Sequence, residues 1–438
     1  MSDARLKLAK FVMTLQNQCK IPHWSLAGES IIYASALSKK PVFGPRTNRL
    51  HKIIHFANKF HFTDIIIILV GLVEGLKIWA TVKRESIFRK QSINYKTIFV
   101  GFGAKSEEVI VEDINQEIMR INEDFHKGAG LLGCPALSSL ILLVVKIAFG
   151  HTSKYKTAVE EISTNQINFI TSSATNIGKY AFYRLYWKMV KTKEIKEAIF
   201  IVPSISAFAC VDDKSIKTTF IQHGLLSMAI LMPAFNNIKL LTRDEQRYYQ
   251  FLFPDINISR KKYLSQGNAK NRIMMFLSIN IRSEERIPEA LPLIKWAKKN
   301  DFIVVIRPAY PATPEQIKTL SLTLPAFILD DAKKSFEESL ETWSPMAVVS
   351  WTSTGLATAL DYGTLPISLY NAETGDRAWE RTHPVIKEIM LYPMLKRFIF
   401  WSNDQERIIK ALLYSDYFEL EINKLRNASD DLLKNLKI

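Results

Sequence analysis

A run of hydroxyl side chains directly follows a short apolar stretch of this chain. Four hydroxyl residues, Ser350, Thr352, Ser353 and Thr354, come after Ala347-Val-Val349 and before Gly355. The pattern predicts a strand, a tight turn and the start of a helix. A helix start offers unpaired N–H groups and the positive end of the dipole, which suit a phosphate. The alternative is an ordinary N-cap cluster, because Ser and Thr favour caps without any ligand.

A histidine at the end of another strand pattern could act as a base. His223 follows the run Thr218–Gln222 and precedes Gly224. Histidine titrates near neutral pH, so it can take a proton from a hydroxyl group, and glycine lets a ligand approach closely. We therefore expect His223 to be the general base, with Gln222 and Gly224 beside it. The alternative is a turn histidine that caps the sheet.

Polar residues also end two further strand patterns. Arg307 ends the run 302–306, and its guanidinium could pair with a donor phosphate. Ser278 ends the run 273–278, Asn280 and Arg282 follow it, and these residues are expected to hold the nucleotide. The alternatives are a solvated arginine at a strand end and simple loop polarity.

Strands and helices that alternate along most of the chain must position these residues. Such alternation predicts parallel sheets, and 438 residues fit two domains. We expect an α/β protein with two Rossmann-like domains that face a cleft, at 1–262 and 270–438, joined by a polar linker within 253–271. Further helices are expected at the N-terminus. The pattern predicts strands at 97–100, 167–171, 198–202, 218–222, 238–241, 273–278, 302–306, 327–329, 347–350 and 365–370.

Composition narrows the function classes. The net charge of +15 favours an anionic partner, such as a nucleotide, an acidic glycan or an anionic membrane surface. The basic residues are spread along the chain without a nucleic-acid-binding motif, so no nucleic-acid partner is expected. Three cysteines without a CxxC pair favour the cytoplasm. The apolar runs 64–74 and 137–146 are too short to span a bilayer, and core helices or strands are preferred over membrane-surface contact.

Three stretches together resemble a family of bacterial cell-surface transferases. Phe220-Ile-Gln-His-Gly224 looks like the His-Gly motif of capsule-type Kdo transferases. Ile306-Arg-Pro-Ala-Tyr-Pro311 resembles the Lys-Pro-His-Pro element of bacterial sialyltransferases and Kdo transferases. Ser350-Trp-Thr-Ser-Thr-Gly355 resembles their Ser/Thr-rich motif. The resemblance covers mainly residues 200–370 and implies the GT-B fold, with the donor on the C-terminal domain.

The chain departs from this family pattern at identifiable places. Ala309 and Tyr310 stand where the family carries its histidine, and His383-Pro384 is a second pair that could reach the cleft. Gly103 follows the strand pattern 97–100 and is expected to form a cleft loop. The acidic motif of the sialyltransferases is missing, since Asp212-Asp213 lacks its glycine.

The resemblance and the residues lead to one functional expectation. We expect an inverting, metal-independent glycosyltransferase that moves a CMP-activated keto sugar acid, such as Kdo or a sialic-acid relative, onto a surface glycan or lipopolysaccharide. No cofactor is expected, and no Asp-x-Asp metal motif occurs in the chain. The enzyme would be cytoplasmic and peripheral to the anionic inner membrane. The alternatives are a UDP-sugar or CDP-polyol transferase, or a non-catalytic nucleotide- or glycan-binding partner of a polysaccharide export system.

Overall fold

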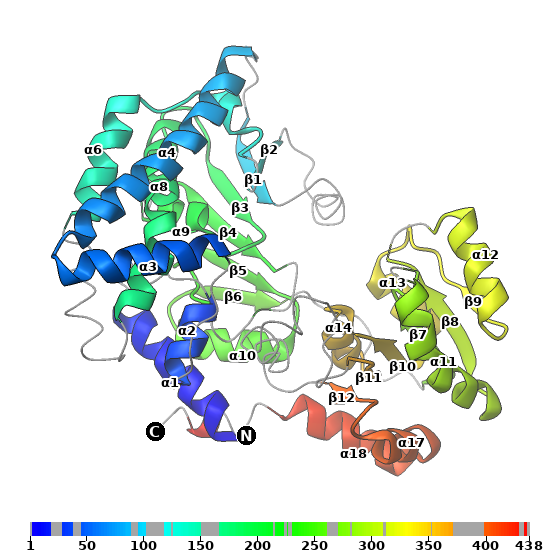
Figure 1. The fold of residues 1–438 in the computed structure, drawn as a ribbon. Helices are drawn as coiled ribbons and strands as arrows, with labels where there is room; N and C mark the ends of the chain where they lie inside the picture. The colour runs from blue at the N-terminus through cyan, green and yellow to red at the C-terminus, as the bar shows by residue number, and fades with distance from the viewer. Residues whose placement is uncertain are drawn as a thin grey trace. The chain divides into compact units, whose positions relative to one another are not determined.

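The protein folds into two compact units, which are described separately (Figure 1). The first comprises Met1–Leu240 with Tyr249–Ser259, and the second comprises Leu241–Tyr248 with Arg260–Ile438. The computed structural model describes residues 2–18, 29–37, 45–88, 95–101, 118–123, 126–149, 166–212, 215–222, 226, 230–260, 270–280, 283–309, 312–351, 353–370, 398–428 and 433–435.

The first unit contains a six-stranded sheet. Its strand order is β2-β1-β3-β4-β5-β6, and every pairing with a described register is parallel. Parallel strands need crossover connections and are buried on both faces, and β1 is accordingly buried throughout. The strands are β1 (Thr97–Gly101), β2 (Ile118–Asn122), β3 (Glu197–Phe200), β4 (Lys217–Ile221), β5 (Asn237–Leu240) and β6 (Asn257–Arg260).

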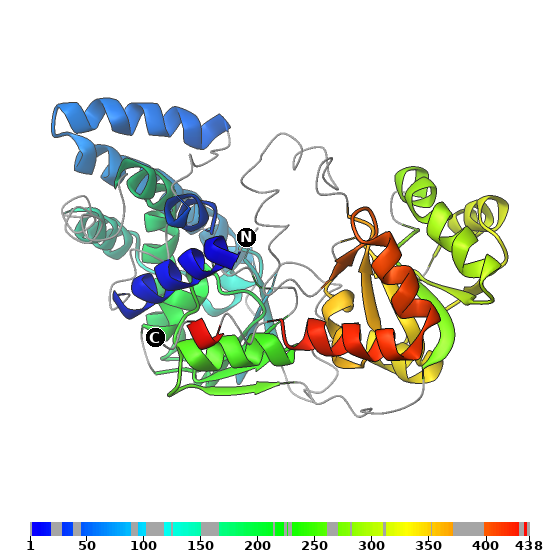
Figure 2. The same cartoon turned by 90° about the horizontal axis from the view of Figure 1, so that it is seen from below.

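A long aromatic helix, α8 (Gln166–Val190), lies at the centre of the helical part of this unit. The Trp187 ring contacts the Phe200 ring of β3, with ring centroids 5.8 Å apart. Helices α4 and α6 pack against α8 and against each other, on the side of α8 away from the strands (Figures 1 and 2). The other elements here are α1 (Ser2–Gln18), α2 (Glu29–Ala36), α3 (Pro45–Lys59), α4 (Thr63–Phe88), η1 (Ala129–Leu132), α6 (Leu137–Ala148) and α9 (Ile205–Val211). The residues of α10 (Arg243–Leu252) are divided between the two units.

Glycines let α4 and α8 approach closely. A Cβ atom added to Gly178 of α8 would lie 2.1 Å from the carbonyl oxygen of Gly71 and 2.5 Å from the backbone nitrogen of Gly75, both on α4. No side chain fits in that space, so the two backbones meet directly.

Several expected elements of the first unit are corrected by the structure. The strand predicted at 167–171 is wrong, because these residues form the first turns of α8. The preference of their β-branched residues for a strand is outweighed by the burial of these residues along a continuous helix. Strands β2 and β6 were not predicted, and β6 lies inside the expected linker. The apolar run near 65–80 is the helix α4, with one buried face and one exposed face.

The second unit contains a second six-stranded sheet that is entirely parallel. Its order is β12-β11-β10-β7-β8-β9. The chain begins at the centre with β7, builds outward to β9, and returns to the centre with β10, which is the doubly wound Rossmann order. The strands are β7 (Asn271–Leu277), β8 (Ile303–Arg307), β9 (Ile328–Leu329), β10 (Pro345–Ser350), β11 (Leu365–Ser368) and β12 (Ile399–Phe400).

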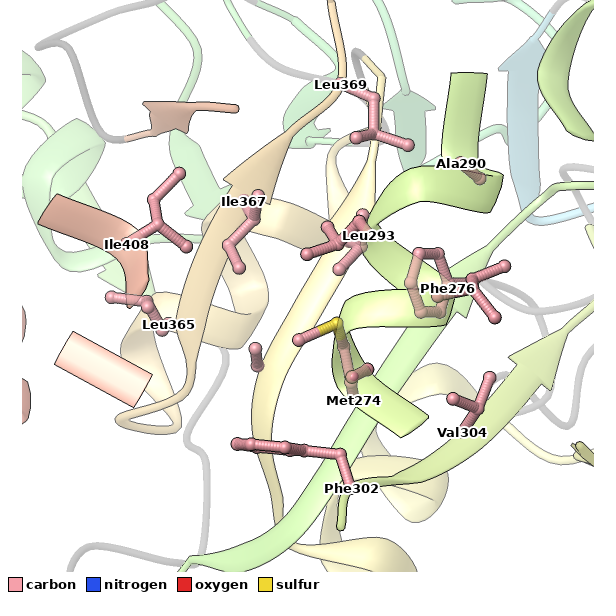
Figure 3. Packing of buried hydrophobic residues seen from close by; sticks show 14 of the residues in the cluster. Met274, Phe276, Ala290, Leu293, Phe302, Val304, Leu365, Ile367, Leu369 and Ile408 are labelled. Atoms are coloured by element: carbon pink, nitrogen blue, oxygen red, sulfur yellow. The ribbon is translucent and has the colours of Figure 1, made fainter. Parts of the chain in front are cut away.

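The core of the second unit lies between this sheet and its helices. Figure 3 shows Phe276 of β7 and Ile367 of β11 among the buried side chains, with Leu293 and Ile408 contributed by helices. The first of these helices begins at Ser283 and includes Pro288 and Pro292. The helices are α11 (Ser283–Lys299), α12 (Pro314–Thr323), α13 (Phe336–Trp343), α14 (Gly355–Asp361), α17 (Gln405–Leu413) and α18 (Ser415–Arg426).

The structure confirms the α/β class, the parallel sheets and the additional N-terminal helices. Two Rossmann-like units are consistent with this architecture. The GT-B arrangement, in which the two units face a shared cleft, stays a prediction.

Candidate functional site

The strand order of the second unit defines where a ligand is expected. In doubly wound sheets, ligands bind at the carboxyl ends of the two central strands, where the strand order reverses. Here those strands are β7 and β10, which pair directly through Val349 and Phe276. The chain after β7 begins with Ser278, and β10 ends with Ser350. The fold therefore brings these two expected site residues to the same point of the sheet edge.

Ser278 has a strained backbone conformation at this point. Its φ is 59°, a left-handed value that is uncommon for a residue with a side chain. Two contacts hold it there. Its N–H donates to the carbonyl oxygen of Arg307 at 2.8 Å, and its own carbonyl accepts from Arg286 at 2.7 Å. The chain turn after β7 is thus fixed from both sides.

Arg286 is the basic side chain at the switch point, and the sequence analysis did not single it out. Its guanidinium carbon lies 4.6 Å from the ring centroid of Trp351, whose indole N–H donates to Glu289. Trp351 is buried and directly follows β10. Arg286 is on the first turn of α11. It lies nine residues after the end of β7, and the sequence gives no local sign that its side chain returns to the strand end.

The hydroxyl run after β10 forms a compact turn. Ser350 is buried at the strand end. The Ser353 side chain accepts from the Gly355 N–H at 3.1 Å, and the carbonyl oxygens of Ser353 and Thr354 accept the first N–H groups of α14. The expected strand, turn and helix are therefore present. Of the hydroxyl residues expected here, Thr352 lies outside the described residues.

Gly355 is required by packing as well as by any ligand. A Cβ atom at this position would lie 2.8 Å from Cδ1 of Leu277 and 3.1 Å from a ring carbon of Phe336. The close approach of α14 to the end of β7 therefore accounts for the glycine. Its expected role in donor binding stays a prediction.

Arg307 makes several contacts within the second unit. Its guanidinium pairs with Asp330 at 2.6 Å and donates to the Ser339 hydroxyl at 2.6 Å and the Lys334 carbonyl at 2.5 Å. The Arg307 side chain is only 11% exposed. Burial opposes ionisation of Asp330, but hydrogen bonds from Ser339, Trp343 and Arg307 outweigh it and lower its pKa. Arg307 ties β8 to the loop after β9, and its contact with a donor phosphate stays a prediction.

Asn280 joins two loops at the same sheet edge. Its side-chain oxygen accepts from the Ala309 N–H at 3.2 Å, and its carbonyl accepts from the Gln316 side chain at 3.3 Å. The residue is buried, so it positions the chain after β8. Direct contact between Asn280 and a nucleotide stays a prediction.

Of the remaining candidate site residues, the structure describes only Gln222. Gln222 is buried at the end of β4, where its backbone N–H donates to the Lys239 carbonyl at 2.9 Å. The expected base and the remaining candidates lie outside the described residues: His223, Gly224, Gly103, Arg282, Tyr310 and His383.

A buried polar cluster that the sequence analysis missed lies at the carboxyl edge of the first sheet. Glu123 directly follows β2 and its side chain is 2% exposed. It pairs with Lys179 of α8 at 2.8 Å, and its Oε1 lies 3.4 Å from the N–H of Ser206, in the first turn of α9. Residues 123 and 179 are far apart in the sequence, so no local pattern pairs them.

His126 extends this cluster. Its Nδ1 lies 2.8 Å from the Tyr183 hydroxyl. Burial, followed by the positive charge of Lys179, lowers the pKa of His126 to about 4. The imidazole is therefore neutral at physiological pH.

We expect His126 to make folding stability depend on pH below 6.5. Between the ordinary histidine pKa of 6.5 and about 4, the unfolded chain binds a proton that the folded chain does not. Stability should therefore fall as the pH falls through this range. His126→Asn should flatten this dependence in urea unfolding curves measured from pH 7 to 4, because asparagine does not titrate and tolerates the left-handed φ of 55°.

A matched control exists for this prediction. His61 is exposed and has a similar φ of 60°, so His61→Asn makes the same chemical change outside the cluster. It should leave the pH dependence as in the wild type. Equal slopes for wild type and His126→Asn would contradict the assignment.

The described residues contain no group of three or more His, Cys, Asp or Glu side chains arranged to hold a metal ion. The expectation of metal-independent chemistry stays a prediction. No protein-family model matches the chain, and no curated protein is significantly similar to it. The assignment of function therefore rests on the motifs and on the geometry of the sheet edge.

Proposed function

We propose that the protein is a glycosyltransferase that binds a CMP-activated keto sugar acid at the switch point of the second unit. The observation that carries the proposal is the convergence of Ser278, Ser350 and Arg286 at the carboxyl ends of β7 and β10. A doubly wound sheet offers its ligand position there. Hydroxyl groups and one guanidinium are suitable partners for a single phosphate.

Within this proposal, the roles divide between two sheet edges. Arg286, stacked on Trp351, would stabilise the charge on the departing phosphate, and the turn at Ser353 and Thr354 would supply hydroxyl groups. His223, after β4 in the first unit, is the proposed base that takes the acceptor proton. The resemblance to Kdo transferases and sialyltransferases favours a CMP-linked donor, and a single phosphate needs fewer cationic partners than a diphosphate.

The first test is thermal unfolding with a nucleotide panel. CMP at millimolar concentration should raise the melting temperature, since a ligand that binds only the folded state stabilises it by mass action. UDP and CDP should have smaller effects. Stabilisation by UDP without any by CMP would eliminate the donor choice, and stabilisation by CDP alone would favour a CDP-polyol donor.

Two arginines of the second unit provide a matched pair of variants. Arg286 stacks on Trp351 and donates to a backbone carbonyl at the carboxyl end of β7. Arg272 likewise stacks on Phe302, at 5.0 Å, and donates to the Asn300 carbonyl, but it lies at the opposite end of β7. Arg286→Ala should remove the stabilisation by CMP, whereas Arg272→Ala should retain it. Equal behaviour of the two variants would refute the proposed position of the site.

Catalysis is tested separately with CMP-N-acetylneuraminic acid as the probe donor. Release of CMP should depend on His223, so His223→Ala should abolish turnover while CMP still raises the melting temperature. Binding of CMP without turnover by the wild type, on donor and acceptor panels, would favour the non-catalytic binding partner.

A further inference from the structure

Helix α4 carries an unusual stripe of exposed apolar side chains. Its buried residues recur every three or four positions, from Thr63 to Val82, and this face packs against α8. The opposite face is equally apolar and each of its members is between 38% and 57% exposed: Phe62, Ile65, Leu69, Val73 and Leu76. An amphipathic helix of a soluble protein normally has polar residues on that face.

The neighbouring helices extend this surface. Helix α3 joins α4 through the short turn at 60–62 and exposes Ile53, Phe56 and Phe60 to 51%, 65% and 54%. Helix α6, which packs beside α4, exposes Leu142 and Phe149 to 71% each. Large exposed apolar surfaces mark interaction sites in soluble proteins. The exposed apolar residues of α3, α4 and α6 are referred to below as the apolar face.

The charges around the apolar face are mainly basic. Helix α3 has no acidic residue, and its Arg49, Lys52 and Lys59 are exposed, as are Lys83 and Arg84 near the end of α4.

Helix α4 carries three acidic residues. Asp64 lies in its first turn, Glu74 is paired with Arg46 and with Lys77, and Glu85 accepts the backbone N–H groups of Gly128 and Gly130. The basic residues of α3 and α4 outnumber these acidic residues. A surface with large apolar side chains and an excess of Lys and Arg is complementary to anionic lipid headgroups above an acyl layer.

We propose that the apolar face docks on the surface of an anionic lipid bilayer. The exposed side chains of α3, α4 and α6 would enter the boundary between headgroups and acyl chains, and Lys52, Lys59 and Lys83 would contact the headgroups. This inference rests on the helices of the first unit and is independent of the proposed glycosyl transfer.

Two other occupants of the apolar face fit the structure less well. Helix α4 is the one described helix that is long and apolar enough to cross a membrane. However, its buried face meets the backbone of α8 at Gly178, and a spanning helix would lose this contact. A second copy of the chain would place the basic residues of α3 against each other in a two-fold interface, which like charges oppose. A bilayer surface offers acyl chains to the apolar side chains and anionic headgroups to the basic side chains.

Sedimentation of the full-length protein with lipid vesicles tests the proposal. Phosphatidylcholine vesicles that contain phosphatidylglycerol should bind the protein, with weaker binding to phosphatidylcholine alone and partial release by salt. The double variant Leu69→Gln/Val73→Gln should bind at least tenfold more weakly. Both residues are about half exposed, so their replacement should leave the melting temperature unchanged.

The control variants carry the same kinds of substitution at positions in the second unit. Leu322→Gln and Leu420→Gln replace leucines that are 77% and 59% exposed in the second unit, and both should leave vesicle binding as in the wild type. Lys52→Glu/Lys59→Glu should weaken binding to anionic vesicles only, whereas Lys298→Glu/Lys299→Glu should not.

Four results would overturn the proposal. The first is the absence of wild-type binding to anionic vesicles, and the second is an equal loss in the control variants. The third is resistance of the bound protein to alkaline carbonate extraction, which would indicate a spanning helix. The fourth is a dimer in sedimentation velocity that Leu69→Gln/Val73→Gln dissociates, which would assign the apolar face to a second copy.

Discussion

Replacing Arg307 with methionine is expected to lower the free energy of unfolding by about 3–5 kcal/mol, because it leaves a buried carboxylate without its charge partner. The Asp330 side chain is 4% exposed and keeps only its hydrogen bonds from Ser339 and Trp343 when the guanidinium is removed. The loss should appear as a lower midpoint in urea unfolding followed by circular dichroism. Lys333→Met removes an exposed positive charge from the same region and should change stability by less than about 0.5 kcal/mol.

Two further measurements separate the ion pair from other effects of this substitution. The double variant Arg307→Met/Asp330→Asn should recover much of the lost stability, since neither partner is then charged. The lowered pKa of Asp330 means that the ion pair stabilises the fold above the ordinary aspartate value of 3.8 and is lost as the pH falls through the lower folded value. A loss below about 1 kcal/mol in Arg307→Met at pH 7 would show that Arg307 is not tied to Asp330 as described.

Gly178→Ala is expected to destabilise the first unit by about 1–3 kcal/mol or more, which is opposite in sign to the usual effect of this change. Inside a helix, alanine is ordinarily more stable than glycine by about 0.5–1 kcal/mol. Here the new methyl group would lie 2.1 Å from the Gly71 carbonyl oxygen, so α4 and α8 must move apart. Thermal and urea unfolding measure the effect.

Thr175→Ala serves as the control for Gly178→Ala, since Thr175 is a partly exposed residue on the same helix. It should have a small effect. An increase in stability in Gly178→Ala would contradict the close approach of α4 and α8.

Most strands of the two sheets could be predicted, because short apolar runs end at polar or turn residues. The run ending at Pro203 and the run ending at Arg307 are of this kind, and both are strands. The residues 167–171 show the limit of this reasoning. A five-residue stretch that is rich in β-branched residues looks the same in a buried helix as in a strand, and only the neighbouring helices decide between the two.

The candidate site shows a different limit. Strand-end residues such as Ser278 and Ser350 could be located from the sequence, since the edge of a parallel sheet collects them. The direction in which a side chain points could not be predicted from the sequence. Arg307 has the same sequence signature whether it points to a ligand or to Asp330, and that partner is 23 residues away. Arg286 was missed because its position depends on how α11 packs back over the end of β7.

The cluster at the edge of the first sheet has a consequence for how the two sheets can be used. The Glu123 carboxylate already lies 3.4 Å from an N–H group at the start of α9, and Lys179 balances its charge. The protein thus supplies its own anion at a position where a mononucleotide fold would otherwise attract a phosphate. A phosphate at this position would have to displace the protein's own carboxylate. The carboxyl edges of the two sheets are therefore not equivalent as positions for an anion, and under the proposed function the donor is expected at the second sheet.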